Sequence, residues 1–245
     1  MACRLLLSQS VRLAISYIVA LAVFATACGD ADYPDPLPAT AVSELRRTLD
    51  ASRGVADHPW REVAPTNPDG TINAYIEVSR GDHRKWELNM ATNALEVDRF
   101  NDPGAGPFPI NFGFVPQTVF YDGDPLDVIV LGPPLPGGRA TRGVLLGVLL
   151  IEDEQGRDPK LVLSPVDAAG QPQSSLAEVE RRSLADFFTR YKRGQERMFS
   201  NAAGWGSVAD ASQELRLAHG FFEQCQDTKS DACRVRLDAP VTVRD

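Results

Sequence analysis

The sequence predicts an α+β protein in which a group of short β-strands precedes two helices. Short apolar runs separated by Gly, Pro, Asn and Asp occupy residues 58 to 165, and helical spacing of apolar residues appears only after them. No internal repeat is evident in the sequence. Strands first and helices last favour a β core with helices packed outside it. Several short strands in about a hundred residues favour a small barrel or a sandwich.

We expect four strands, bounded by turn residues, at Asn73–Ser79, Trp86–Asn89, Val128–Leu131 and Val144–Ile151. The helical residues follow in two groups. Leu184, Phe187, Phe188 and Tyr191 fall on one helical face, with Ser183 and Asp186 placed as a capping box. A second helix is predicted from Ser207, with an apolar face made of Val208, Ala211, Leu215, Ala218 and Phe222.

Composition excludes some functions and leaves others open. The chain has 245 residues, 43% hydrophobic and 24% charged, which suits one globular domain plus appendages. Its net charge of -8 has the wrong sign for a protein that binds nucleic acid through phosphates. The 3 histidines are not spaced for a zinc-protease helix. The acidic surplus therefore indicates either solubility or a metal site made of oxygen ligands.

The first 27 residues predict an export signal, because they combine two arginines, no acidic residue and an apolar run too short to be a confident membrane span. The signal ends in small residues directly before Cys28, which resembles the lipobox of bacterial lipoproteins. In that family the peptidase cuts before the cysteine and a diacylglycerol is attached to its thiol. Ala25 stands where the lipobox usually has leucine. Ordinary cleavage without lipidation, or an uncut anchor, remains an alternative.

Residues 28–57 predict a tether between lipid and domain. Pro34, Pro36 and Pro38 alternate along an extended stretch, and residues 41 to 52 could form a short helix. The globular domain is then expected at 58–205, followed at 206–245 by a C-terminal helix and a disulfide-closed extension.

Two cysteines remain after export and lipidation. In an oxidising compartment Cys225 and Cys233 predict one disulfide that closes a short loop. Two unpaired thiols or a weak metal pair are the alternatives.

The candidate chemistry lies in two acidic turns. In the first, three carboxylates of Asp122, Asp124 and Asp127 crowd around Pro125, and like charges this close repel unless a cation lies among them. The second turn, 153–160, adds two aspartates and a lysine. Oxygen ligands without His or Cys suit Mg²⁺, Mn²⁺ or Ca²⁺. Taken alone, either turn could equally be a solvated surface loop.

Seven segments favour a metal site over a solvated surface loop, because they occur together, in order and with consistent spacing. They are Ile76-Glu77-Val78, Lys85-Trp86-Glu87, Val97 to Phe100, Pro109 to Thr118, Asp122-Gly123-Asp124-Pro125-Leu126-Asp127, Asp153 to Lys160, and Tyr191-Lys192. The series resembles family I soluble inorganic pyrophosphatase over roughly residues 58 to 205, and the Asp-Gly-Asp-Pro-Leu-Asp block is that family's signature. The resemblance implies an OB-like five-stranded β-barrel with flanking C-terminal helices and an active site at one end of the barrel.

The resemblance also implies a role for each matched residue. Asp122, Asp127, Asp153 and Asp158 would hold several Mg²⁺ ions, with Mn²⁺ as a substitute, and Glu77 and Glu87 would help through water. Asp124 matches the general base for the nucleophilic water. The groups that hold the two phosphates would be Lys85, Arg99, Lys160, Tyr191 and Lys192. Without the resemblance, Glu77, Glu87, Arg99 and Lys192 could be surface residues and Tyr191 a core residue.

The chain departs from the family at Phe108 and Phe112, where tyrosine is usual. The rings can still pack, but two hydroxyls near the metals and phosphate are missing. Losing a hydrogen bond there would cost on the order of 0.5 to 3 kcal/mol. We therefore expect an active enzyme that is slower or has a shifted pH profile.

The sequence thus predicts a Mg²⁺-dependent hydrolase of pyrophosphate, exported and lipid-anchored to a bacterial membrane on its periplasmic side. Its expected partners are the substrate and the membrane, with no nucleic acid and with homo-oligomers as a family trait. One alternative is a hydrolase of nucleotides or other organic diphosphates. Another is a non-catalytic metal-binding lipoprotein on the same fold.

Overall fold

A computed structural model describes residues 37, 39–52, 55–166 and 172–225 of the chain. The expected signal segment, the lipidation residue Cys28 and the disulfide partner Cys233 lie outside these residues. Cys225 is buried and disulfide-bonded, and its pairing with Cys233 stays a prediction. Within the described ranges, no helix has both the length and the apolar character needed to cross a membrane.

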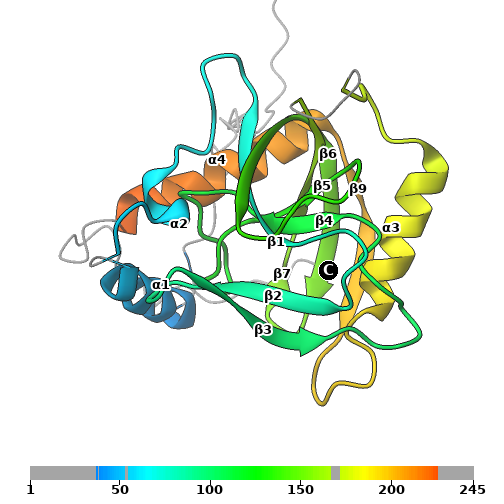
Figure 1. Ribbon diagram of the computed structural model, residues 1–245, viewed down its shortest axis with the longest axis horizontal. Helices are drawn as coiled ribbons and strands as arrows, with labels where there is room; N and C mark the ends of the chain where they lie inside the picture. The colour runs from blue at the N-terminus through cyan, green and yellow to red at the C-terminus, as the bar shows by residue number, and fades with distance from the viewer. Residues whose placement is uncertain (1–36, 38, 53–54, 167–171, 226–245) are drawn as a thin grey trace, which may run out of the picture. The chain divides into compact units, whose positions relative to one another are not determined.

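The core is one mixed sheet whose pairings return to their starting strand (Figure 1). β1 pairs with β4, β4 with β5, β5 with β8 and β8 with β6, and β6 pairs again with β1. The strands are β1 (Ile72–Val78), β4 (Asn111–Phe114), β5 (Asp127–Val130), β6 (Arg139–Asp153), β7 (Gly156–Arg157), β8 (Lys160–Pro165) and β9 (Ser200–Gly206). The last of these, β9, and the short β7 both pair with β6. A separate two-stranded sheet joins β2 (Arg84–Asn89) to β3 (Ala94–Phe100).

The four predicted strands are confirmed within a few residues, except that β6 is much longer than expected. It is 15 residues long because different parts of it pair with β1, β8 and β9. Gly143 permits one of these close approaches, since a Cβ atom there would lie 2.5 Å from the backbone oxygen of Ser164. The sequence prediction missed β3, β4, β7, β8 and β9. β4 and β8 are buried throughout and so lack the alternation of a half-buried strand.

The described part of the chain has four helices beside the sheet: α1 (Ala39–Ser52), α2 (Pro59–Glu62), α3 (Glu178–Arg190) and α4 (Val208–Cys225). The predicted start of α3 was wrong. The helix begins five residues before Ser183, and the Ala177 backbone N–H donates to the Glu180 carboxylate at 2.8 Å. The predicted start of α4 is confirmed, since Ser207 Oγ accepts a hydrogen bond from the Asp210 backbone N–H at 3.3 Å.

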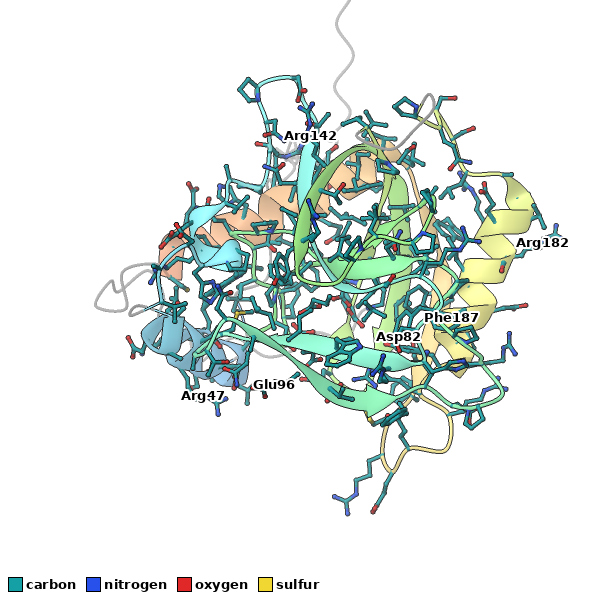
Figure 2. The ribbon with its side chains drawn as sticks, viewed as in Figure 1. Arg47, Asp82, Glu96, Arg142, Arg182 and Phe187 are labelled. Atoms are coloured by element: carbon teal, nitrogen blue, oxygen red, sulfur yellow. The ribbon has the colours of Figure 1, made fainter. Side chains whose placement is uncertain are left out.

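The apolar faces of the helices fix them to the sheet. In α3 the buried residues are Leu184, Phe187 and Phe188, and Figure 2 shows Phe187 on the side facing the sheet and Arg182 on the outer side. In α4 the expected face is buried except for Val208, which is 48% exposed.

The N-terminal helix α1 packs in the same apolar cluster as α4. Leu45 and Leu49 of α1 are buried there with Trp60 and Phe222, and the rings of Trp60 and Phe222 lie 5.1 Å apart. Removing a ring such as that of Phe222 would cost about 3–5 kcal/mol. The chain divisions predicted at residues 27, 57 and 205 stay predictions, while α1 and α4 both belong to this shared core.

Candidate active site

Strand direction brings the two acidic turns to one end of the sheet. β5 and β8 are parallel, so their first residues, Asp127 and Lys160, lie at the same end. β6 runs antiparallel to β8, which places its last residue, Asp153, at that end as well. Asp158 lies in the short connection between β7 and β8. Residues separated in sequence therefore converge because the strands that carry them are paired.

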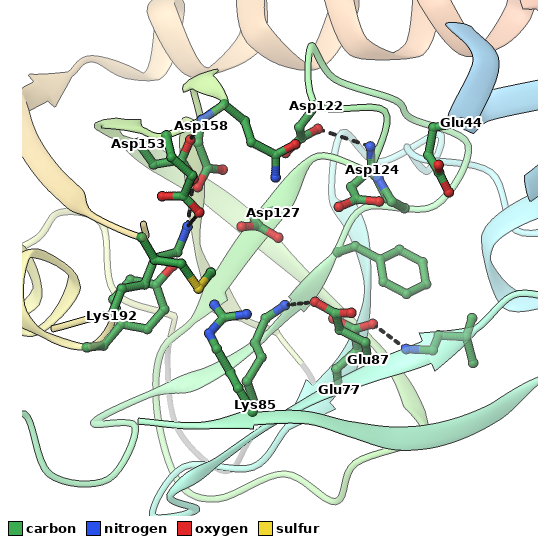
Figure 3. A pocket seen from close by; sticks show the side chains of 18 of the residues that line it. Glu44, Glu77, Lys85, Glu87, Asp122, Asp124, Asp127, Asp153, Asp158 and Lys192 are labelled. Carbon is green, nitrogen blue, oxygen red and sulfur yellow. Dashed lines mark hydrogen bonds and ion pairs between the residues drawn. The ribbon is translucent and has the colours of Figure 1, made fainter. Parts of the chain in front are cut away.

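The turn 122–124 precedes β5 and is held by its own backbone. The Asp124 N–H donates to the Asp122 carboxylate at 3.0 Å (Figure 3). The Phe120 N–H donates to the Asp124 carbonyl at 2.7 Å. Gly123 has φ 95°, a left-handed conformation that favours glycine. These contacts place the Asp124 side chain toward the same space as Asp122 and Asp127.

The β2–β3 hairpin supplies the opposite wall. Lys85 and Arg99 are cross-strand partners. Glu87 lies two residues after Lys85 on the same strand, so their side chains share a face, and Lys85 Nζ donates to Glu87 Oε1 at 2.6 Å. The Glu77 carboxylate of β1 accepts from the Leu88 backbone N–H at 2.8 Å, which ties the hairpin to the main sheet.

The segment after α3 supplies a third wall. Tyr191 and Lys192 follow the last residue of α3 directly. Lys192 Nζ donates to Asp153 Oδ2 at 2.7 Å and to Glu154 Oε1 at 3.1 Å. Tyr191 is only 2% exposed and packs with the rings of Phe187 and Phe188, yet it also lines the pocket. The two expected roles of Tyr191, in the core and at the site, are therefore compatible.

These walls enclose a pocket of about 260 Å³. All of the sequence-predicted site residues except one line it. They are Glu77, Lys85, Glu87, Arg99, Asp122, Asp124, Asp127, Asp153, Asp158, Tyr191 and Lys192. The roles assigned to them stay predictions, while their assembly around one space is a structural fact.

Lys160 is the exception, because it does not line the pocket. Its side chain is fully buried and bonds to the carboxylates of Asp127 and Asp158, the latter at 2.8 Å. It lies behind these two aspartates and pairs with them, and its expected role in holding phosphate stays a prediction.

Crowding makes several carboxylates hard to ionise. Burial and the nearby charges of Asp124 and Asp158 raise the pKa of Asp122 well above its ordinary value. Burial, with Asp127 nearby, raises the pKa of Asp158 to about 7, against the opposing effect of Lys160. Burial raises the pKa of Glu77 to about 8. Burial of the carboxylate and the charge of Glu87 raise the pKa of Asp124 to about 6, although its side chain is open to the pocket.

The lysines behave in the opposite way. Burial alone would lower the pKa of Lys85, but the carboxylates of Glu87 and Glu77 outweigh burial and raise it. Asp127 and Asp158 have the same effect on the buried Lys160. Both ammonium groups therefore stay charged at neutral pH.

The donor set fits hard divalent cations, since it consists of carboxylate oxygens with no imidazole or thiol. Burial first, and then the negative charge of neighbouring carboxylates, raise the pKa values of Asp122 and Asp124, and a bound cation would offset both effects. As arranged here, no three carboxylate, imidazole or thiol groups among the described residues surround a common point. Lys160 and Lys192 instead bind Asp127, Asp158 and Asp153.

The two phenylalanines that replace tyrosines are buried beneath the site. Phe108 and Phe112 are 0% and 1% exposed, with ring centres 5.7 Å apart. The Phe112 ring lies 5.7 Å from Lys85 Nζ and 5.5 Å from Lys160 Nζ. An aromatic face thus meets two ammonium groups, a favourable contact that needs no hydroxyl.

Sequence reasoning missed several pocket residues. Glu154 directly follows Asp153, so its place in the acidic turn could have indicated it. Met198 enters from the loop before β9. Glu44 and Thr48 come from α1, far from the motifs in sequence, and no sequence signal could have indicated them.

Comparison with known sequences agrees with the family resemblance carried by the motifs. The sequence profile described as Inorganic pyrophosphatase matches residues 74–223. An inorganic pyrophosphatase of Saccharolobus solfataricus is 32% identical over 154 residues, which are 60% of this chain and 89% of the relative. One from Rhodospirillum rubrum is 37% identical over 153 residues, which are 59% of this chain and 85% of the relative.

Solved structures agree with the sequences. The inorganic pyrophosphatase of Coxiella burnetii is 32% identical with a TM-score of 0.61, covering 65% of this chain and 99% of its own. That of Thermus thermophilus is 29% identical with a TM-score of 0.60, covering 67% of this chain and 99% of its own. With the pocket residues assembled as the motifs predict, the sequence and structural matches show that this chain belongs to the inorganic pyrophosphatase family.

Proposed function

We propose that this protein hydrolyses inorganic pyrophosphate to two phosphates with Mg²⁺. One observation carries the proposal: a single pocket joins the crowded carboxylates of the turn 122–127 to the cations Lys85, Arg99 and Lys192. A substrate with two linked phosphates carries several negative charges that repel a nucleophilic hydroxide. Cationic side chains in the pocket can neutralise the phosphates directly, and the carboxylates can hold metal ions that neutralise them further.

Asp124 is the proposed general base. Its carboxylate faces the pocket, and its pKa of about 6 leaves it mostly ionised yet basic enough to accept a proton from water at neutral pH. Across the pocket, the planar guanidinium of Arg99 can donate a fork of hydrogen bonds to phosphate oxygens. The ammonium groups of Lys85 and Lys192 add point charges.

Asp122, Asp127, Asp153 and Asp158 are the proposed Mg²⁺ ligands, with Glu77 and Glu87 acting through water. When bound, Mg²⁺ lowers the pKa of a bound water and neutralises charge on the phosphoryl group. Lys160 and Lys192 hold three of these aspartates, so their ammonium groups set the orientation of the carboxylates.

The shape of the pocket disfavours the reading as a nucleotide hydrolase. Phe114 and Tyr191 are the aromatic residues that line it, and each is only 2% exposed. Neither ring therefore presents an open face on which a nucleobase could stack. The reading as a non-catalytic binding protein is disfavoured because the pocket retains Asp124 together with every predicted metal carboxylate.

The test is phosphate release from pyrophosphate by the purified domain, with Mg²⁺ and with EDTA. We expect turnover that EDTA abolishes and Mn²⁺ partly restores. Nucleoside diphosphates at the same concentration should be cleaved far more slowly. Absence of Mg²⁺-dependent turnover would contradict the enzyme proposal, and equal cleavage of nucleoside diphosphates would support the organic-diphosphate alternative.

We also propose that the protein is exported and lipid-anchored through Cys28. The support is the arginine-containing apolar segment and the small residues before this cysteine. In cells fed a labelled fatty acid, the wild type should acquire label and sediment with membranes, while Cys28→Ser should do neither. Equal labelling of the variant would refute the anchor.

The finer architecture is likewise a proposal. We infer an OB-like barrel of β1, β4, β5, β8 and β6, supported by the return of the strand pairings from β6 to β1. Association into homo-oligomers, a trait of the family, is proposed with it and can be checked by light scattering.

A further inference from the structure

Helix α1 forms a wall of the pocket although it lies outside the family domain. It spans Ala39–Ser52, whereas the match to the family begins at residue 74. Glu44 and Thr48 of this helix line the pocket together with Asp122 and Asp124. Figure 3 shows Glu44 beside Asp124, on the side of the pocket away from Lys192. A segment that the sequence predicts as part of a tether therefore reaches the catalytic turn.

The contact between α1 and the turn is tight. A Cβ atom added to Gly123 would lie 2.8 Å from Glu44 Cβ, 3.1 Å from Glu44 Cγ and 3.2 Å from Ala41 Cα. Ala41 is fully buried, so its backbone faces the turn without an intervening side chain or solvent. The turn has no room to shift toward the helix, and its internal hydrogen bonds hold Asp122 and Asp124 as one unit.

The helix itself is fixed to the domain. Leu45 and Leu49 are 0% and 4% exposed and belong to the same apolar cluster as Trp60 and Phe222. Burial of this kind gives α1 a defined place relative to α4 and the sheet. The helix can therefore act as a rigid support for a loop that touches it.

We propose that α1 is a positioning element for the catalytic turn. Ala41 and the aliphatic stem of Glu44 support Gly123 and thereby fix the Asp124 carboxylate against the substrate. The inference rests on the proposed function, in which Asp124 is the general base. It extends the active site to a helix that the family domain does not include.

The test compares one substitution at two places on α1. Ala41→Leu adds bulk inside the apolar cluster at the residue whose Cα lies against Gly123, so the helix must shift there to make room. Ala39→Leu adds the same bulk at an exposed position. We expect Ala41→Leu to lower kcat on the order of 10- to 100-fold, because displacing a reacting group by about 1 Å has effects of this size. KM should change by less than about threefold, since the substrate-holding cations lie on other elements. Ala39→Leu and the conservative Ala41→Ser should keep wild-type kcat.

Hydrogen exchange gives a readout that does not depend on turnover. The amides of Phe120, Gly123 and Asp124 should exchange faster in Ala41→Leu than in the wild type. In Ala39→Leu their exchange rates should equal those of the wild type. Wild-type exchange and kcat in a folded Ala41→Leu protein would overturn the proposal. A wild-type enzyme without turnover would instead refute the proposed function, while the exchange result would still test the support by α1.

A second pair of variants applies if Ala41→Leu fails to fold. Glu44 is partly exposed, so shortening it should leave the fold intact. Glu44→Ala should lower kcat because the stem is lost, and Glu44→Gln should retain kcat because the stem remains. Equal losses in both variants would show that charge matters instead of packing, and this too would overturn the proposal.

Discussion

The two sides of the pocket are built in different ways. The carboxylate side comes mainly from one short block, 122–127, and from strand ends that pairing places beside it. The cation side comes from three separate places in the chain: Lys85 on β2, Arg99 on β3 and Lys192 after α3. The block 122–127 is thus contiguous in sequence, whereas the three cations opposite it come together only when the chain folds.

Their electrostatics differ as well. On the cation side, Lys85 and Lys192 each bond to a carboxylate, Glu87 and Asp153, and both keep a raised pKa. On the carboxylate side, burial and mutual repulsion raise the pKa values of Asp122 and Asp158. Both lysines of the cation side thus have carboxylate partners, while the carboxylate side lacks positive charge that divalent cations can supply.

The largest effect should come from removing the base on the carboxylate side. Asp124→Asn should lower kcat by a factor on the order of 10² to 10⁴, because an amide cannot accept the proton of the attacking water. KM should stay close to the wild-type value, since the cation side is intact. Phosphate release at saturating substrate measures this, with Asp186→Asn on the exposed face of α3 as the control. Equal turnover by the Asp124 variant would remove its assigned role.

A smaller effect should follow on the cation side. Arg99→Gln should lower kcat/KM on the order of 10- to 100-fold, as expected for losing charged hydrogen bonds worth about 1.5–3 kcal/mol. The change should lie mainly in KM. Arg182→Gln is the matched control, because this arginine is exposed and bonds to Glu178 on the same helix. An unchanged KM for Arg99→Gln would place Arg99 outside the substrate contacts.

The lack of positive charge on the carboxylate side should appear in the pH dependence of the free energy of unfolding. Without Mg²⁺, the pKa values of about 8 for Glu77 and about 7 for Asp158 exceed the unfolded value, so the folded state binds more protons at neutral pH. The free energy of unfolding should therefore fall as pH rises from about 6 to about 8, by up to about 1.4 kcal/mol per pH unit for each group. Saturating Mg²⁺ should flatten this slope.

Thermal midpoints across this pH range, in EDTA and in Mg²⁺, measure the effect. Glu77→Gln should remove part of the slope in EDTA, because an amide does not titrate. Stability that rises with pH in EDTA, or the same slope with and without Mg²⁺, would contradict the account of the carboxylate side.

The smallest effect concerns the tyrosine hydroxyls that are missing at Phe108 and Phe112 beneath the site. Phe112→Tyr should raise kcat/KM between about twofold and tenfold, as expected for one hydrogen bond worth about 0.5–1.5 kcal/mol. Phe222→Tyr, fully buried in another cluster, should give no gain in rate. No gain from Phe112→Tyr would show that the contact of this ring with Lys85 and Lys160 already suffices.

The sequence predicted elements whose pattern is local. The α+β order, four of the strands and the start of α4 at Ser207 follow from alternation, spacing and capping. Strands β4 and β8 were missed, because burial on both faces removes alternation. The start of α3 was placed too late, because its first turn buries no residue and its one apolar side chain, Val179, is exposed.

The same division applies to the site. The sequence by itself indicated which side chains line the pocket, since the carboxylate block 122–127 and the other motif residues are identifiable by type and spacing. The tertiary structure alone decided that Lys160 lies behind Asp127 and Asp158, and that Glu44 of α1 borders the pocket. Such contacts join residues far apart in the chain, and strand pairing and apolar packing of helices fix them, which no local pattern encodes.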